Sequence, residues 1–77
     1  MTSPHQPRRP GWRCADCHDE WPCARRRAEL RAEFEGDRVR LALHMAGYLG
    51  EAVLDHPDAA ESLLYDRFLA WCHDWRR

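Results

Sequence analysis

The fold of this chain depends most on residues 12–23, which read Trp12-Arg13-Cys14-Ala15-Asp16-Cys17-His18-Asp19-Glu20-Trp21-Pro22-Cys23. Three of the four cysteines fall within this stretch, at the spacing C-x2-C-x5-C. A C-x2-C pair places two thiolates on one tight turn, where they suit two adjacent corners of a tetrahedral metal. The third cysteine is near enough to supply another corner. The stretch therefore predicts a metal-binding knuckle formed by Cys14, Cys17 and Cys23.

A structural zinc site needs a fourth ligand. The candidates are His5, His18, Cys72 and His73. His18 directly follows Cys17, and a neighbour can rarely turn back to complete the same tetrahedron. His5 lies in a proline-rich arm, and proline lowers the entropy cost of ordering such an arm. We therefore predict structural zinc as the cofactor, with His5 as the fourth ligand and His18 as the alternative.

Size and composition fit a small metal-stabilised protein. A chain of 77 residues has a marginal hydrophobic core, and structural zinc adds roughly 10–16 kcal/mol of apparent binding energy. With twelve basic and thirteen acidic residues, the net charge is near zero and creates no overall electrostatic field that would attract nucleic acid. No apolar run long enough to span a membrane and no signal segment is evident, so we expect a cytoplasmic protein without membrane contact. In that compartment, clustered cysteines more often bind metal than form disulfides.

Three helices are expected after the knuckle. The first begins at Pro22 or Cys23 and stops at Gly36, the second runs from Arg38 to about Asp55, and the third starts with Asp58 as its cap. The second helix should be the most buried, through an apolar spacing of three to four residues. Its apolar positions at this spacing are Val39, Leu43, Ala46, Leu49 or Gly50, and Val53, and the apolar surface is widened by Leu41, Met45, Tyr48, Ala52 and Leu54. The glycines Gly47 and Gly50 suggest close packing against a neighbour.

These patterns predict an all-α fold, a small three-helix bundle with an N-terminal zinc knuckle. Residues 1–77 are expected to form a single domain. Within it, residues 1–23 would be an extended arm and the knuckle, and residues 24–77 the helical body.

The order of residues resembles a family of small actinobacterial zinc-knuckle proteins of unknown function. The motifs that carry the resemblance are His5-x-Pro7-x-Arg9-Pro10-x-Trp12-x-Cys14-x2-Cys17-x3-Trp21-Pro22-Cys23, Arg27-x2-Leu30-x3-Phe34-x2-Asp37-Arg38-Val39 and Arg67-Phe68-Leu69-x-Trp71. The absence of Lys, Ile and Asn is typical of a high-GC genome. The resemblance implies glycine in place of His18, which favours His5 as the ligand. Some members are labelled flavin reductases, but nothing in these residues supports flavin chemistry.

No phosphate loop, dinucleotide fingerprint or Ser-His-Asp arrangement is present, so we expect no enzyme activity. The four tryptophans exceed what a small core requires, and tryptophan is favoured at interfaces. The alternative is that they pack the knuckle onto the third helix. We therefore expect an adaptor or regulatory protein that acts through a protein partner, with a homodimer compatible with the sequence. The predicted partner-binding residues are Arg25, Arg26, Trp71 and Trp75.

Three alternatives stay open. A nucleic-acid-binding regulator could use the arginines around the knuckle. A redox sensor could release zinc when its thiolates are oxidised. A WhiB-like regulator could hold an iron–sulfur cluster on the same three cysteines, although such proteins need a fourth cysteine upstream and only His5 precedes Cys14 here.

Overall fold

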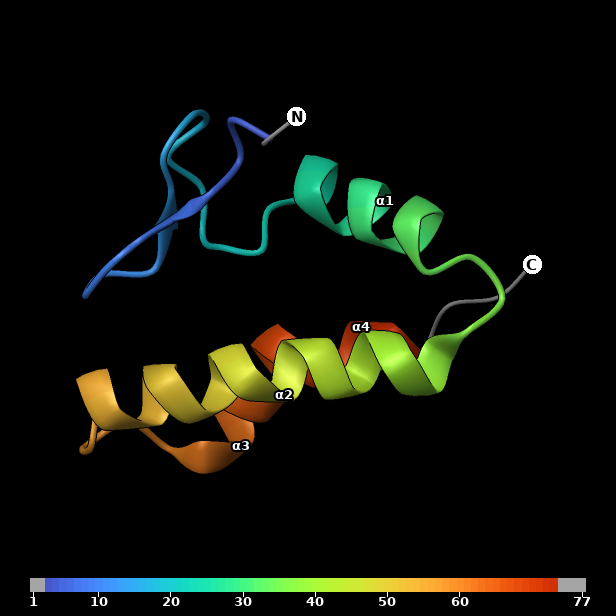
Figure 1. Ribbon diagram of the computed structural model, residues 1–77. Coiled ribbons are helices and arrows are strands. Elements are labelled where there is room, and N and C mark those ends of the chain that lie inside the picture. Colours follow the sequence, from blue (N-terminus) through green and yellow to red (C-terminus); the bar gives the residue numbers. More distant parts are fainter. Residues whose placement is uncertain (1–2, 74–77) are drawn as a thin grey trace.

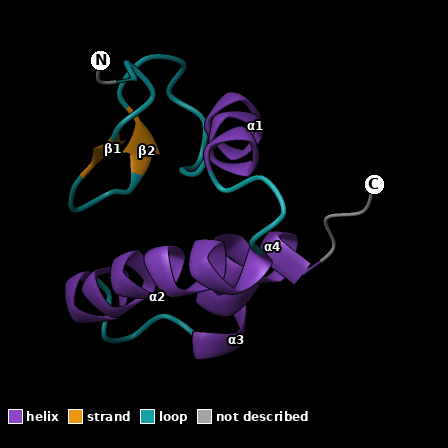
Figure 2. Cartoon of the chain, turned by 45° about the vertical axis from the view of Figure 1, so that its right-hand side comes forward, coloured by secondary structure: helices purple, strands orange, loops and turns teal. Residues whose placement is uncertain are grey.

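The computed structural model describes residues 3–73, and Figure 1 shows them in two layers. The first layer holds two short strands, β1 (Pro7–Arg8) and β2 (Arg13–Cys14), followed by helix α1 (Ala24–Glu33). The second holds helix α2 (Arg38–Asp55), helix α3 (Glu61–Tyr65), the π-helical turn η1 (Asp66–Ala70) and the short helix α4 (Trp71–His73). Figure 2 shows the same separation after a 45° turn.

The prediction of an all-α fold is wrong, because β1 and β2 form a small antiparallel sheet. Pro7 pairs with Cys14 and Arg8 with Arg13. The N–H of Ala15 also donates to the carbonyl oxygen of Gln6 at 2.8 Å. A proline in the arm does not prevent this pairing, since proline is tolerated at the start of an edge strand. The sheet holds the N-terminal arm against the knuckle.

Helix α1 begins at Ala24, one residue after Cys23, and ends at Glu33, short of the predicted stop at Gly36. Helix α2 begins and ends as expected, and the Asp37 carboxylate accepts the N–H of Arg40 at 3.0 Å as its cap. The prediction that Asp58 caps the third helix is wrong, because α3 begins at Glu61 after Ala60, which makes no side-chain cap. A backbone turn, with the N–H of Ala59 donating to His56, takes up the residues between α2 and α3.

Four aromatic side chains join the two layers. Trp12 and Trp21 of the knuckle are each 1% exposed. The ring of Trp12 lies 5.4 Å from Phe68 of η1, and the ring of Trp21 lies 4.8 Å from Tyr48 of α2, both nearly edge to face. Edge-to-face pairs of this kind are stabilising beyond the area that they bury. The two tryptophans therefore pack the knuckle onto the helical body.

Helix α2 buries only part of its predicted apolar surface. Its buried residues are Leu41, Met45 and Ala52, whereas Val39 and Leu43 are 71% and 69% exposed. The expectation that Gly47 and Gly50 allow close packing is not met within the described residues. A Cβ built at either glycine would meet no packing neighbour within 4 Å. Helix α2 therefore has apolar residues on two sides, and the described part of the chain covers only one.

Candidate metal centre

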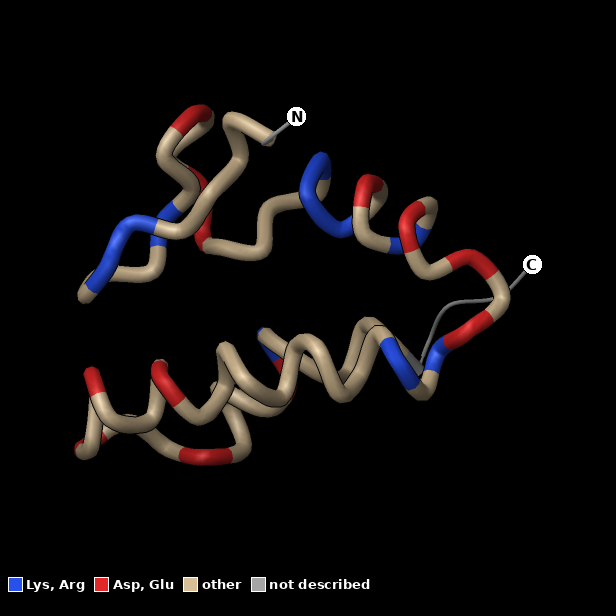
Figure 3. The backbone as a smooth tube through the Cα atoms, viewed as in Figure 1, with Lys and Arg blue, Asp and Glu red and all other residues tan. Residues whose placement is uncertain are grey.

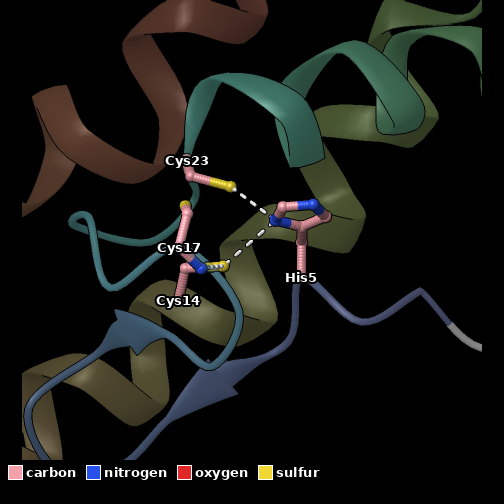
Figure 4. A group of neighbouring side chains, drawn as sticks. All are labelled: His5, Cys14, Cys17 and Cys23. Atoms are coloured by element: carbon pink, nitrogen blue, oxygen red, sulfur yellow. Dashed lines mark hydrogen bonds between the residues drawn. The ribbon is translucent and has the colours of Figure 1, made fainter.

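The structure brings His5, Cys14, Cys17 and Cys23 together, and their ligand atoms all lie within 4.8 Å of one another. Figure 4 shows how separate segments supply them. His5 precedes β1, Cys14 ends β2, Cys17 lies on the following turn, and Cys23 immediately precedes α1. Pairing of β1 with β2 positions His5 opposite the cysteine turn. This cluster could hold a metal ion.

The spacing suits one tetrahedral ion. With zinc–sulfur bonds of about 2.3 Å and zinc–nitrogen bonds of about 2.0 Å, a tetrahedron separates nitrogen from sulfur by roughly 3.5 Å. The Nδ1 atom of His5 lies 3.2 Å from the sulfur of Cys14 and 3.4 Å from that of Cys23. A [4Fe–4S] cluster puts its four ligands on four different irons, which spaces them more widely than this. The geometry therefore favours a single ion.

The backbone around Cys14 forms the tight turn that a C-x2-C knuckle needs. The N–H groups of Asp16 and Cys17 each donate to the Cys14 sulfur at 3.4 Å. The N–H of His18 donates to the carbonyl oxygen of Cys14 at 3.0 Å, and His18 has a φ of 66°. That conformation favours glycine. The turn therefore gives a physical reason for a glycine at position 18 in a knuckle of this kind.

Contacts on every side fix the orientation of His5. Its backbone carbonyl accepts the indole N–H of Trp21 at 2.9 Å, and its backbone N–H donates to the Ser3 hydroxyl at 3.1 Å. While Nδ1 faces the sulfurs, Nε2 lies 3.5 Å from the carboxylate of Asp16. A carboxylate on the outer nitrogen holds a ligating histidine in the correct tautomer and raises its basicity. Asp16 thus supports Nδ1 as the ligand atom.

The thiols influence one another electrostatically. Burial raises the pKa of Cys14, but hydrogen bonds from the N–H groups of Cys17 and Asp16 and from His5 outweigh it and lower that pKa to about 6. The N–H of Asp19 favours the Cys17 thiolate, yet desolvation and the sulfurs of Cys14 and Cys23 raise the pKa of Cys17 to about 11. The Cys17 sulfur thus lies too close to the other two to ionise readily unaided. A bound cation would relieve this repulsion.

The other predicted ligands do not join this group. His18 is exposed and lies outside the cluster. Cys72 is fully buried in the hydrophobic core, where its thiol lies 3.9 Å from the carbonyl oxygen of Phe68 and burial raises its pKa to about 11. The side chain of His73 lies outside the described part of the chain.

Most of the predicted partner-binding residues have partners within the chain. Arg26 is mostly buried and pairs with Glu29 at 3.2 Å and with Glu33 at 3.4 Å. Trp71 is 5% exposed and lies beneath the guanidinium groups of Arg27 and Arg31. Arg25 is exposed and 3.8 Å from Glu29, and Trp75 lies outside the described residues. Partner binding through these four residues stays a prediction.

Sequence reasoning missed two groups that hold the knuckle in place. Arg67 of η1 donates from Nε to the carbonyl oxygen of Trp21 at 2.8 Å and from Nη2 to that of Trp12. Asp55, at the end of α2, accepts the indole N–H of Trp12 at 2.8 Å and two N–H groups of Arg9 at 2.8 and 3.0 Å. Hydrogen bonding to Arg9 lowers the pKa of Asp55. No local motif marks such long-range contacts.

Comparison with known proteins gave no match: no family model, no curated protein and no solved structure matches the chain. Among residues 3–73, none of the helices combines the length and apolar character needed to cross a membrane.

Proposed function

We propose that His5, Cys14, Cys17 and Cys23 bind one structural zinc ion, and that the zinc-stabilised chain acts as a small adaptor or regulatory protein. The observation behind this proposal is the convergence of the four ligand atoms within 4.8 Å. Three sulfurs and one imidazole are a common donor set for structural zinc. When bound, zinc supplies cross-linking between the arm, the knuckle turn and the start of α1.

The cluster also argues against catalysis by the metal. Catalytic zinc keeps an open position for water or substrate, whereas four protein ligands complete the tetrahedron. The exposed apolar side chains favour contact with other proteins; Val39, Leu43, Leu54 and Leu63 are each at least 67% exposed. Arg9 and Arg26 contact carboxylates and Arg67 contacts carbonyl groups, which leaves less of the basic surface for nucleic acid.

The test is the metal content of protein purified without oxygen, measured by elemental analysis for the wild type, His5→Ala and the matched control His18→Ala. We expect one zinc per chain in the wild type and in His18→Ala, and at least a tenfold loss of zinc affinity in His5→Ala. A brown protein containing iron would overturn the zinc assignment. Equal effects of the two histidine substitutions would overturn His5 as the fourth ligand.

A further inference from the structure

The uncovered side of α2 is a continuous apolar stripe. Val39, Leu43, Ala46, Gly50 and Leu54 recur every three or four residues and are all exposed, with Leu54 at 80%. Beside its first half lies a groove of about 520 Å³, lined by Arg38, Val39, Ala42, Leu43, Ala46 and Leu69. A helix with apolar residues on both sides normally packs on both. The stripe therefore needs a partner from outside the described chain.

We propose that a second copy of this chain covers the stripe, with the two α2 helices antiparallel about a two-fold axis near residues 46 and 47. This arrangement sets Val39 level with Leu54 of the second copy and Leu43 level with its Gly50. Leucine thus meets glycine near the centre, and large apolar residues meet at both ends. Gly50 leaves open space in the monomer, and Leu43 of the other copy fills that space in the dimer. The stripe is complementary to itself in this one direction.

Charge favours the same direction. Helix α2 carries Arg38 and Arg40 in its first turn and Glu51 and Asp55 in its last two turns. In Figure 3 the tube is accordingly blue near the start of this helix and red toward its end. Arg40 and Glu51 are about three helical turns apart at 3.6 residues per turn, so both lie along the same edge of the stripe. In an antiparallel pair, the two-fold axis places the same edge of both helices side by side. Arg40 of each copy therefore lies near Glu51 of the other. A parallel pair would bring the basic ends together. Glu51 already contacts Arg9 at 3.0 Å and is half exposed, which leaves it within reach.

The contact is small, which sets the expected affinity. A helix of 18 residues is about 27 Å long and about 10 Å wide, so α2 contributes on the order of 270 Å² per copy. That is below the size of a standard interface, so we expect weak association that is seen only at high protein concentration. The proposal names one partner for the interaction role proposed above, and it does not depend on which metal is bound.

Sedimentation equilibrium of the metal-loaded full chain, from 5 µM to 1 mM, tests the proposal. The wild type should shift from monomer to dimer across this range. Leu43→Glu should weaken association at least tenfold, whereas the matched control Leu63→Glu, an equally exposed leucine on α3, should leave it unchanged. Circular dichroism and metal content keep a folding defect distinct from a lost interface.

The orientation is tested by charge reversal. Arg40→Glu and Glu51→Arg should each weaken the dimer, and the double variant should restore it, because opposite charges would again face each other across the interface. A wild type that stays monomeric at 1 mM would overturn the proposal, as would equal effects of Leu43→Glu and Leu63→Glu. A double variant no tighter than the single ones would overturn the antiparallel arrangement. Zinc binding by His5 and the cysteines would stand in each of these cases, since its readout is separate.

Discussion

Replacing Arg67 with methionine should detach the knuckle from the helical body. Arg67 donates to the carbonyl oxygens of both Trp12 and Trp21. Burial lowers its pKa, so the guanidinium already bears a desolvation cost, which these two bonds offset. Methionine keeps most of the aliphatic packing and removes both donors. The Trp12 carbonyl retains the N–H of Trp21 at 3.0 Å, whereas the Trp21 carbonyl loses its charged donor.

A hydrogen bond from a charged donor contributes about 1.5–3 kcal/mol, so we expect Arg67→Met to lower the free energy of unfolding by about 3 kcal/mol. For a domain of this size, each kcal/mol corresponds to about 4–8 °C, and the midpoint should fall by about 12–24 °C. Urea unfolding followed by tryptophan fluorescence gives the free energy directly. The free zinc concentration must be the same for all variants, because bound metal stabilises the folded state.

Arg25→Met is the matched control, because the Arg25 side chain is 73% exposed and its pair with Glu29 is long. It should change the free energy of unfolding by no more than about 0.5 kcal/mol. If Arg67→Met cost less than about 1 kcal/mol, the aromatic contacts and Asp55 would hold the knuckle without Arg67, and the role given to the guanidinium would be wrong.

Three further predictions concern the metal centre. Asp16→Asn should weaken zinc binding about tenfold in a chelator competition, because the support of His5 Nε2 is lost; unchanged affinity would remove Asp16 from the site. At pH 7, zinc binding should release the proton of Cys17, whose pKa is about 11, and release should grow below pH 6 as Cys14 also becomes protonated. Calorimetry in buffers of different ionisation enthalpy measures this, and no release at pH 7 would contradict it. His18→Gly should raise the free energy of unfolding by about 1 kcal/mol without changing zinc content, since φ is positive there; a lower stability would refute this account of the turn.

Local signals predicted the local features. Asp37 caps α2 because a short acidic side chain reaches the N–H of Arg40, and this needs only neighbouring residues. The C-x2-C spacing likewise predicted that Cys14 and Cys17 share one turn. The place of His5 beside them followed from the need for a fourth ligand, and whether it binds metal stays a prediction.

What failed depended on contacts between separate segments of the chain. The sheet forms because residues 6–8 pair with residues 13–15, and proline content alone gave no hint of that pairing. The buried face of α2 could not be chosen from periodicity, because both of its sides carry apolar residues. The knuckle determines which side of α2 is buried, because Trp12 and Trp21 cover the side that includes Tyr48. Arg67 and Asp55 act across more than 40 positions of the chain, a range that no motif spans.

The paired indoles give this chain an unusual optical property. Trp12 and Trp21 lie with their ring centroids 6.0 Å apart and their planes inclined by 44°. Two identical chromophores this close, and neither parallel nor perpendicular, couple their electronic transitions and produce a signed pair of bands in the far-ultraviolet circular dichroism spectrum. Helix content read from that spectrum would therefore be distorted. The same couplet would disappear when the knuckle itself unfolds, even if every helix stayed intact.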